Sequence, residues 1–595
     1  MIRGYFLLTV FNDLDELQRQ IVENTNENIL LIAGPGSGKT RVLVHKIANA
    51  LEKNSNKKIG CLGLTFTSEA AKKMKEELEK LVSANNLRGT FLGNYHQFGQ
   101  YLLRKYGHHL GISRNFRVID EEQSLSVLSE TVDRLGINGY TKKKLHDQIY
   151  RFRGNAKMPK EEDLSGTPEE FVRIVQEFEK DRRSQNLLDF DDLISLPIKL
   201  LRNNLPLKKH IQYLFQYVFV DELQDTSFLQ LEFLKLICDP KNNLIFGVAD
   251  EDQILYEWRD ARVETIEDFR KFFNATEKWL VYNYRSPQLI LDVADSLIKN
   301  NQVRHDRSLI SKVKDSKGFV YMHKTDDPTE EARYVATNIQ KSIESGNQNA
   351  SHAIFLRDAW MMKDIKKSLY EQQIPFVHIG DRSFQKKPLT RFTKMAISIA
   401  SGFNEPFERT FEYFKGLKNE YHIIPFYEKE LHDLIDYLAK KPISHFVRDL
   451  YTKIGITKDF GADSDSDEHI ILRIIEYAIV QGATSYTVLN DMLTMEWNRL
   501  QDQVLMSENK VKLMTIHQAK GQEFPVVYIM HMEDSYIPRI RKNSTFNLPE
   551  ERRLLFVAIT RAMKKVLMTY SRSEKMQMEP SRFLKEIPAS LIIYI

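Results

Sequence analysis

The sequence has 595 residues, enough for about three to five packed domains. Hydrophobic residues make up 42% and charged residues 28%, a balance that excludes a disordered chain, and the net charge of +4 gives no strong sign of a nucleic-acid partner. Two cysteines, Cys61 and Cys238, are too few for a disulfide framework or a zinc site. No apolar run reaches the ~18 residues of a membrane span, so we expect a cytoplasmic protein with no membrane partner.

Short apolar, β-branched runs alternate with long amphipathic patterns, which predicts an α/β protein built on buried parallel strands. The expected strands are, in chain order, 29–32, 59–64, 217–220, 244–248, 511–516 and 526–530. Several of them run directly into a polar cluster, as loops do at the carboxyl ends of strands in an open sheet. Residues 93–188 and 385–508 show helical periodicity instead. Within the first of these segments, Thr167, Pro168 and Glu170 match a capping box, which predicts that a helix begins there.

A glycine-rich loop follows the first expected strand and predicts a phosphate-binding site. Its residues are Ala33, Gly34, Pro35, Gly36, Ser37, Gly38, Lys39, Thr40 and Arg41. The glycines would let backbone N–H groups approach phosphate oxygens, Lys39 would reach the β- and γ-phosphates, and the Thr40 hydroxyl would bind Mg²⁺. Ala33 stands where this motif usually has glycine, so a chance Gly/Ser loop is the alternative. The strand before the loop and the helical pattern after it favour a nucleotide phosphate site.

An acidic pair follows the expected strand at 217–220 and would complete such a site. Asp221 would hold Mg²⁺, and Glu222 would polarise the attacking water. A helix start that is rich in acids, favoured by the helix dipole, is the alternative reading of this pair alone. In combination with Lys39, the pair predicts an NTPase that depends on Mg²⁺.

Further segments of recognisable composition occur in a fixed order. They are LTFTSEAA at 64–71, LLDFDDL at 187–193, GVADEDQILYEWRDA at 247–261, VYNYRSP at 281–287, KLMTIHQAKGQEF at 512–524 and ERRLLFVAITRA at 551–562. Together with the phosphate loop and the acidic pair, they resemble the UvrD/Rep/PcrA family of superfamily 1 DNA helicases. The resemblance runs from Gln18 to Arg561, nearly the whole chain.

This resemblance implies two RecA-like motor domains of the P-loop NTPase class, with ATP between them and an inserted, mostly helical domain in each. The expected parts are a first motor domain at 1–92 and 189–272 with its insertion at 93–188, and a second motor domain at 273–384 and 509–595 with a short insertion at 385–508. Members of the family hydrolyse ATP with Mg²⁺ and move 3′→5′ along single-stranded DNA. The chain would be a compact member without a fused nuclease domain, for which the resemblance allows a separate nuclease or repair partner protein.

The resemblance also implies roles for residues around the nucleotide. Those expected at the base and ribose are Gln18 at the adenine edge, Arg41 and Tyr284 beside the base, and Glu523 at the ribose. Those expected at the γ-phosphate are Gln253, which would couple it to the DNA site, Arg285, and Arg561 as an arginine finger. Two arginines arriving from a second domain would tie hydrolysis to closure, because they stabilise the charge of the phosphoryl group in transfer. A surface ion pair is the alternative for each of them.

The family's single-strand contacts fall on residues of two kinds. The expected stacking group is Phe66, Tyr256, Trp258 and Arg259, and the residues near the strand backbone or the coupling path are Thr65, Asn94, His96 and His517. Ordinary core packing is the alternative for the aromatic residues. Ile254 stands where the family has serine, and Glu257 and Asp260 replace glycines around Trp258. Seven basic residues in 142–160 predict either a duplex contact or a solvated helix face.

The resemblance, together with the departures from it, implies two alternative functions. The first is an ATP-driven 3′→5′ translocase or helicase that acts on single-stranded DNA and on single-strand/double-strand junctions, in DNA repair, recombination or antiphage defence. The second is an ATP-gated DNA-sensing or recruitment subunit that acts with a separate nuclease partner and does not unwind processively. RNA unwinding is a weaker third reading, because no pattern in the sequence reads a 2′-hydroxyl.

Overall fold

The structure is a computed structural model. It describes residues 11, 13–53, 60–83, 85–137, 139–155, 164, 166–255, 263–302, 304–305, 307–314, 317–402, 407–456, 466–540, 547–572 and 579–595. The chain forms two compact units: the first comprises Met1–Phe116, Leu125–Phe376 and Leu513–Ile595, and the second comprises Arg117–Ser124 and Val377–Lys512. Among the described residues, no helix has both the length and the apolar character that crossing a bilayer requires.

The first unit contains a six-stranded sheet with the order β3-β2-β6-β7-β1-β8, and its strands pair in parallel. Its strands are β1 Ile29–Ala33, β2 Gly60–Thr65, β3 Phe91–Asn94, β6 Phe215–Val220, β7 Leu244–Ala249 and β8 Thr276–Leu280. The helices around it are α2 Glu16–Glu23, α3 Lys39–Lys53, α4 Ser68–Leu81, α5 Tyr95–Tyr106, α9 Asp192–Asn203, α10 Leu205–Leu214, α11 Phe228–Ile237 and α12 Val263–Phe273.

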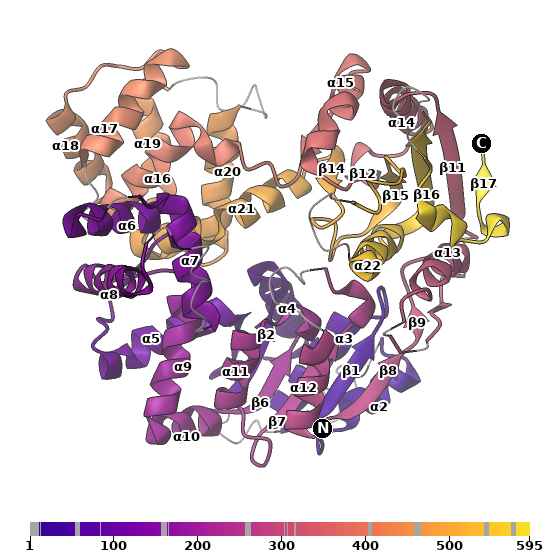
Figure 1. Cartoon of the computed structure of the whole chain (residues 1–595), viewed down its shortest axis with the longest axis horizontal. Helices are drawn as coiled ribbons and strands as arrows, with labels where there is room; N and C mark the ends of the chain where they lie inside the picture. The colour runs from indigo at the N-terminus through magenta and orange to yellow at the C-terminus, as the bar shows by residue number, and fades with distance from the viewer. Residues whose placement is uncertain are drawn as a thin grey trace. The chain divides into compact units, whose positions relative to one another are not determined.

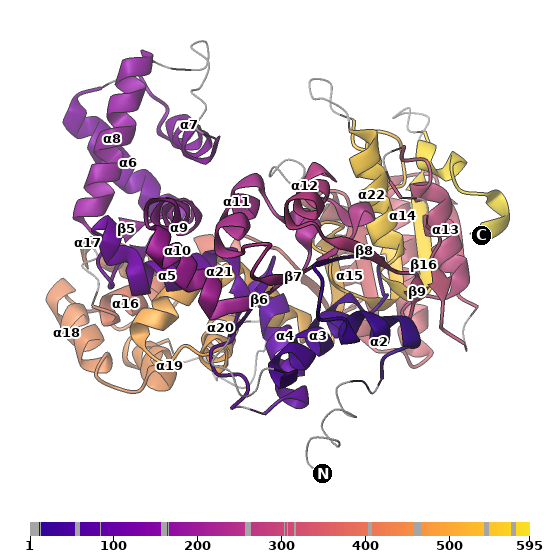
Figure 2. The same ribbon diagram turned by 90° about the horizontal axis from the view of Figure 1, so that it is seen from below.

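Alternate side chains of this sheet enter two different cores, because successive residues of a strand face opposite sides. Leu30 and Ile32 pack with residues of α5, α9, α11 and α12, whereas Ile29 and Leu31 pack with residues of α2, α3 and α4. Figure 2 shows α11 and α12 on one face of the sheet and α3 and α4 on the other. Both faces are therefore covered, which explains why the strands read as continuous apolar runs.

A second, seven-stranded sheet in the order β13-β14-β12-β15-β16-β11-β17 follows (Figure 1). Its strands are β11 Phe319–Thr325, β12 His352–Leu356, β13 Phe376–His378, β14 Val511–Thr515, β15 Phe524–Ile529, β16 Ala562–Ser571 and β17 Ile593–Tyr594. The helices associated with it are α13 Gln288–Ile298, α14 Pro328–Glu344, α15 Lys363–Glu371 and α22 Leu548–Ile559. Two-residue strands occur at β4 Arg117–Val118, β5 Leu187–Leu188, β9 Tyr282–Asn283 and β10 Ile310–Ser311.

Helical segments interrupt the chain on either side of these strands. The first contains α6 Glu121–Leu135, α7 Lys142–Asn155 and α8 Pro168–Ser184. The second contains α16 Pro388–Ala400, α17 Phe407–Gly416, α18 Glu428–Leu438, α19 Ile443–Lys453, α20 Asp467–Val480 and α21 Tyr486–Met506. The latter helices enclose a core of their own that includes the buried Trp497. The α/β prediction of two parallel-sheet motor domains, each with a helical insertion, is confirmed.

The local predictions agree with these elements. Each of the six expected strands is present, with ends shifted by a few residues, and Pro168 begins α8 as the capping box predicts. The Thr167 hydroxyl accepts from the Glu170 N–H at 3.2 Å, and the Glu170 carboxylate accepts from the Thr167 N–H at 3.0 Å. α5 packs in the core of the first sheet, although it lies within the segment predicted as the first insertion. The predicted domain boundaries stay a prediction.

Candidate nucleotide and DNA site

The predicted phosphate loop joins the end of β1 to the start of α3. Gly36 and Gly38 have φ angles of 66° and 81°, in the left-handed region that favours glycine. The Ser37 hydroxyl donates to the Gly34 carbonyl at 2.7 Å, and the Val42 N–H donates to the Gly38 carbonyl at 3.0 Å. These bonds curl the loop over the first turn of α3, where helical N–H groups are free to meet an anion.

Lys39 begins α3 and carries the most telling side chain of this loop. Its Nζ atom is buried and has no hydrogen-bond partner among the described residues. The nearest carboxylates are those of Glu222 at 3.6 Å and Asp250 at 4.0 Å. A buried ammonium group costs free energy unless its donors are satisfied. The unused donors of Lys39, beside the glycine loop, therefore fit a bound polyphosphate.

Asp221 and Glu222 follow β6, on the same edge of the sheet as the phosphate loop. The Asp221 N–H donates to the Leu64 carbonyl at 2.8 Å, which fixes the pair at the end of β2. Burial and the neighbouring Glu222 carboxylate raise the pKa of Asp221 to about 7. Burial acts to raise the pKa of Glu222 as well, but the ammonium groups of Lys39 and Lys520 lower it to about 2. The Asp221 carboxylate and the Thr40 hydroxyl at the start of α3 are oxygen ligands of the kind that Mg²⁺ takes.

Arg285 and Arg561 reach this edge from the part of the chain that carries the second sheet. The Arg285 guanidinium donates to Glu523 at 2.7 Å and to the Thr560 carbonyl at 3.3 Å. Arg561 is 2% exposed and donates to the Gln253 side chain at 3.1 Å. Burial, together with the charge of Arg285, lowers the pKa of Arg561 to about 9. Two neighbouring guanidinium groups, of which Arg561 is buried, favour a ligand with concentrated negative charge.

The loop before Arg285 packs directly on the phosphate loop. The Asn283 amide donates to the Pro35 carbonyl at 2.6 Å, and the Tyr284 N–H donates to the Gly36 carbonyl at 2.8 Å. A Cβ atom on Gly36 would lie 2.8 Å from the Cβ of Arg285. This closeness, together with its φ angle, explains why Gly36 has no side chain.

The resemblance expects the base at Gln18, Arg41 and Tyr284, all of which lie beside the phosphate loop. The Gln18 amide donates to the Ser37 carbonyl at 3.1 Å, while its oxygen accepts from the Asp15 N–H at 3.2 Å. The Tyr284 hydroxyl donates to the Asp15 carboxylate, and its side chain is 45% exposed. Arg41 is exposed and donates to the carbonyl of Asp13 at 3.1 Å. To bind adenine, the Gln18 side chain would therefore have to give up its hydrogen bonds to Ser37 and Asp15.

Three basic residues that join the second motor domain to the first were not predicted from the sequence. Two of them, Arg304 and Arg307, follow α13. They contact η4, the short helix Glu251–Gln253 that follows β7, and the residue that caps it. Arg304 donates to Asp252 at 3.1 Å, and Arg307 donates to Asp252 at 3.0 Å and also to Asp250. No motif marks them, and only the run of basic residues after α13 is a sign in the sequence.

Lys520 is the third of these residues and follows β14. Its ammonium group lies 2.5 Å from an oxygen of Asp225 and 2.9 Å from the carbonyl of Gln253. The Asp225 side chain is 1% exposed, so the contact excludes water. Lys520 therefore ties the segment after β14 to both acidic segments of the first sheet. It stands within the KLMTIHQAKGQEF motif, where the sequence analysis singled out only His517 and Glu523.

Lys520→Met should destabilise the protein and slow ATP hydrolysis, because it leaves the buried Asp225 carboxylate without its cation. Losing one partner of a buried pair costs about 3–5 kcal/mol, whereas replacing both charges costs less. The double variant Asp225→Asn/Lys520→Met should therefore melt above Lys520→Met in thermal unfolding followed by circular dichroism. Lys235→Met, which removes the more exposed Glu232 pair, serves as the control and should change little. Strictly additive losses in the double variant would contradict this coupling.

The predicted DNA residues at the first sheet lie at the ends of β2 and β3. Thr65 is fully buried and donates to the Thr67 carbonyl at 2.6 Å, while Phe66 beside it is half-buried. Asn94 caps α5 and donates from its amide to the Ser68 hydroxyl at 3.1 Å. His96 is half-buried, and burial lowers its pKa to about 4. Thr65 and Asn94 thus shape the edge beside Asp221 through internal hydrogen bonds.

His517 follows β14 in the second sheet. Burial and the charges of Arg357 and Lys520 lower its pKa to about 3. The ring is therefore neutral at physiological pH and can exchange hydrogen bonds, but it cannot act as a cation toward phosphate.

Tyr256, Trp258 and Arg259, with Glu257 and Asp260, lie outside the described residues. Ile254, just before them, is fully buried in the core of the first sheet, and its carbonyl accepts from Arg553 of α22 at 3.0 Å. Ile254, where the resemblance implies serine, is thus held by apolar packing.

The basic run at 142–160 is described only in part, and one of its residues is internal. Arg153 is 7% exposed and lies 2.5 Å from Asp189. The same carboxylate lies 2.9 Å from the fully buried Arg182 of α8. The LLDFDDL motif, which holds Asp189, therefore fastens α7 and α8 to the start of α9, and Arg153 is not part of a solvated face.

Comparison with known proteins gives the same picture over most of the chain. The UvrD/REP helicase N-terminal domain matches residues 14–274, and the UvrD-like helicase C-terminal domain matches residues 279–392 and 447–573. The chain is 28% identical to the ATP-dependent DNA helicase PcrA of Staphylococcus aureus, over 98% of this chain and 87% of that protein. It is 29% identical to probable DNA helicase II homologues of Mycoplasma capricolum and Rickettsia conorii, over 88% and 96% of their lengths. The chain therefore belongs to the UvrD/REP helicase family of ATP-hydrolysing DNA helicases.

Proposed function

We propose that the protein hydrolyses ATP, with Mg²⁺, to move 3′→5′ along single-stranded DNA and to open single-strand/double-strand junctions. The observation that carries the proposal is the meeting of Lys39, Arg285 and Arg561 at one edge of the first sheet. Lys39 is buried without a hydrogen-bond partner among the described residues, and both arginines come from the other motor domain. The phosphates of a nucleoside triphosphate would supply hydrogen-bond acceptors and negative charge to this group of three cations.

The chemistry assigns each group one task. Lys39 and the loop N–H groups would hold the phosphates, and Glu222, ionised at neutral pH, would orient and polarise the attacking water. Arg285 and Arg561 would stabilise the charge of the phosphoryl group in transfer. Asp221 and Thr40 would hold Mg²⁺, which neutralises charge on the β- and γ-phosphates when bound.

Coupling between the nucleotide and the strand would pass through η4. Gln253 accepts from Arg561 on one side, and its carbonyl accepts from Lys520 on the other. Its side chain also donates to Asp250, which Arg307 binds from the second motor domain. Opening of the interface would therefore disturb Gln253, and with it the segment that leads to Tyr256 and Trp258. Alternating closure and opening would then change the grip on a strand with each turnover.

The ATPase rate tests the proposal. We expect hydrolysis by the purified chain to rise steeply when single-stranded DNA is added, and to stay low with matched RNA. The dependence on Mg²⁺ is checked by titrating EDTA into the same reaction. A rate that no DNA substrate changes would contradict the assignment of a DNA-driven motor.

A second candidate is an ATP-gated DNA-sensing subunit that recruits a separate nuclease. The departures at Ile254, Glu257 and Asp260, together with the short second insertion expected from the sequence, favour it. Repair, recombination and antiphage defence are the processes we propose for either form. We place the protein in the cytoplasm, because Cys61 and Cys238 are buried free thiols, which suit a reducing compartment.

A further inference from the structure

Three buried side chains with metal-binding atoms meet in the second motor domain, at residues that the ATP site does not use. Glu331 belongs to α14, and His531 and Glu533 belong to the loop that follows β15. Their side-chain ligand atoms all lie within 4.8 Å of one another. Glu331 and Glu533 are fully buried and His531 is 6% exposed, so water does not satisfy this cluster from outside.

Each carboxylate has one oxygen fixed by the protein. The Oε1 atom of Glu331 accepts from the Thr569 hydroxyl at 2.5 Å and from the His531 N–H at 2.9 Å. The Oε1 atom of Glu533 accepts from the hydroxyl of Ser571 at 2.9 Å and from the N–H of the same residue. Hydrogen bonds of this kind orient metal ligands in proteins, because they hold one oxygen and leave the other directed at the ion.

The remaining atoms face one another without hydrogen bonds. Among the described residues, Glu331 Oε2, His531 Nδ1 and Glu533 Oε2 have no hydrogen-bond partner. His531 Nδ1 lies 3.0 Å from Glu331 Oε2 and 4.0 Å from Glu533 Oε2. Ligand atoms bound at about 2.0–2.2 Å around a tetrahedral ion stand roughly 3.3 Å apart, so these separations suit one shared cation.

The cluster also has an unmet charge requirement. Two carboxylates are buried together, and no lysine or arginine in the described part of the chain forms an ion pair with either of them. The space therefore demands positive charge, which a proton on His531 or a cation can supply.

The backbone of His531 is a second, independent sign. Its φ angle is 58°, in the left-handed region where a residue with a Cβ atom costs about 1–2 kcal/mol relative to glycine. Glycine would adopt this conformation without strain, yet the position carries an imidazole that points into the cluster. Strain of this kind tends to occur at ligand-binding positions.

We propose that Glu331, His531 and Glu533 bind a divalent transition-metal ion of the Zn²⁺ class. One imidazole nitrogen with two carboxylate oxygens is a donor set for Zn²⁺, and a mixed nitrogen and oxygen set disfavours Mg²⁺, which prefers oxygen ligands alone. The ion would join α14 to the loop after β15, while Thr569 and Ser571 tie the same carboxylates to β16. It would thus stabilise the second motor domain and would be separate from the Mg²⁺ that accompanies ATP.

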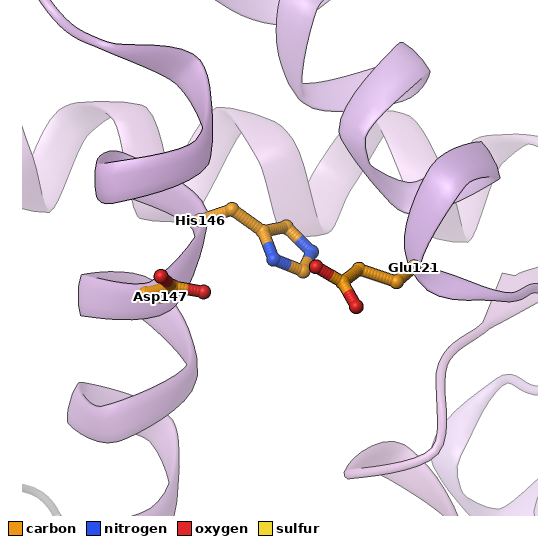
Figure 3. Close-up of side chains that lie close together, drawn as sticks. All are labelled: Glu121, His146 and Asp147. Carbon is orange, nitrogen blue, oxygen red and sulfur yellow. The ribbon is translucent and has the colours of Figure 1, made fainter. Parts of the chain in front are cut away.

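The first unit also holds two neighbouring residues with metal-binding atoms, but they lack these features. His146 and Asp147 lie side by side on α7, with ligand atoms within 4.8 Å of each other (Figure 3). The imidazole is buried, but the Asp147 carboxylate is exposed and can be hydrated. This pair therefore carries no proposal.

The test uses the full-length protein, stripped with EDTA and then dialysed against Zn²⁺ in the presence of excess Mg²⁺. Metal analysis by mass spectrometry should find one Zn²⁺ per chain, and isothermal titration should give the same stoichiometry. His531→Gly and Glu533→Gln should lose this ion. Glycine suits the backbone at residue 531, so His531→Gly should still fold, as circular dichroism will show. His432→Gln is the matched control, because it removes an exposed histidine beside Asp436 and should retain the ion.

Each possible result either supports or overturns the proposed metal site. Zn²⁺ that raises the melting temperature of the wild type and of His432→Gln, but not of His531→Gly, supports the site. Equal Zn²⁺ content in wild type and His531→Gly overturns it, because the ion would then be bound elsewhere. Absence of bound Zn²⁺ in the wild type also overturns it and leaves a protonated His531 as the balancing charge.

Discussion

Lys39→Ala should reduce ATP hydrolysis by on the order of 10³-fold or more, in the presence or absence of DNA. The Nζ atom of Lys39 has no hydrogen-bond partner among the described residues and lies between the glycine loop and the Glu222 carboxylate. Its removal takes away the one ammonium group placed to neutralise the transferring phosphate. It also removes a charge that keeps Glu222 ionised, so the pKa of that carboxyl should rise.

Steady-state phosphate release measures this effect, with circular dichroism to confirm that the variant folds. Lys53→Ala is the matched control, since Lys53 lies at the far end of the same helix and donates to Thr25 on the surface. Its rate should stay close to that of the wild type. A Lys39→Ala protein that is folded and hydrolyses ATP within tenfold of the wild type would remove Lys39 from the site.

Arg561→Ala should leave ATP binding intact and lower hydrolysis by about 10³–10⁵-fold, the usual contribution of an arginine finger. The guanidinium is buried and is held by the Gln253 side chain and, at 3.0 Å, by the Val557 carbonyl. Because the group is buried, it is poorly solvated before any ligand arrives, and its pKa is lowered for the same reason. The guanidinium therefore contributes most stabilisation where negative charge develops, which is in the transition state rather than in the bound nucleotide.

Fluorescent-nucleotide titration and single-turnover hydrolysis separate these two effects. Arg561→Lys should restore little, because lysine cannot reproduce the fork of donors that reaches Gln253 and Val557 together. Arg582→Ala is the control, since Arg582 is 44% exposed and pairs with Asp534 on the surface. If Arg561→Ala lost nucleotide binding and kept normal turnover of what it bound, the finger assignment would be wrong.

The sequence predicts the central strands and the phosphate loop well, because both are local. Apolar runs such as Ile29–Ala33 are buried on both faces, and the capping box at Thr167 needs only four consecutive residues. Edge strands such as β13 and β17 were not predicted from the sequence. They are two or three residues long and partly exposed, so they lack the apolar run that marks a central strand.

Contacts between distant segments could not be predicted. Lys520 meets Asp225 across 295 residues of sequence, and Arg307 meets Asp250 across 57, with no spacing that links the partners. Glu331 and His531 are 200 residues apart and become neighbours only because α14 and the loop after β15 pack at one end of a sheet. The spacing of residues along the chain gives no sign of such pairs, because only the folded sheet brings the partners together.

Strand displacement on tailed duplexes tests the central claim most directly, because it joins hydrolysis to directional movement. The purified chain, with ATP and Mg²⁺, is given one duplex with a 3′ single-stranded tail and one with a 5′ tail. We expect release of the displaced strand from the 3′-tailed duplex, none from the 5′-tailed duplex, and none from either with Lys39→Ala. Stimulation of ATP hydrolysis by both duplexes without release of a strand from either would contradict a motor and would favour the DNA-sensing subunit.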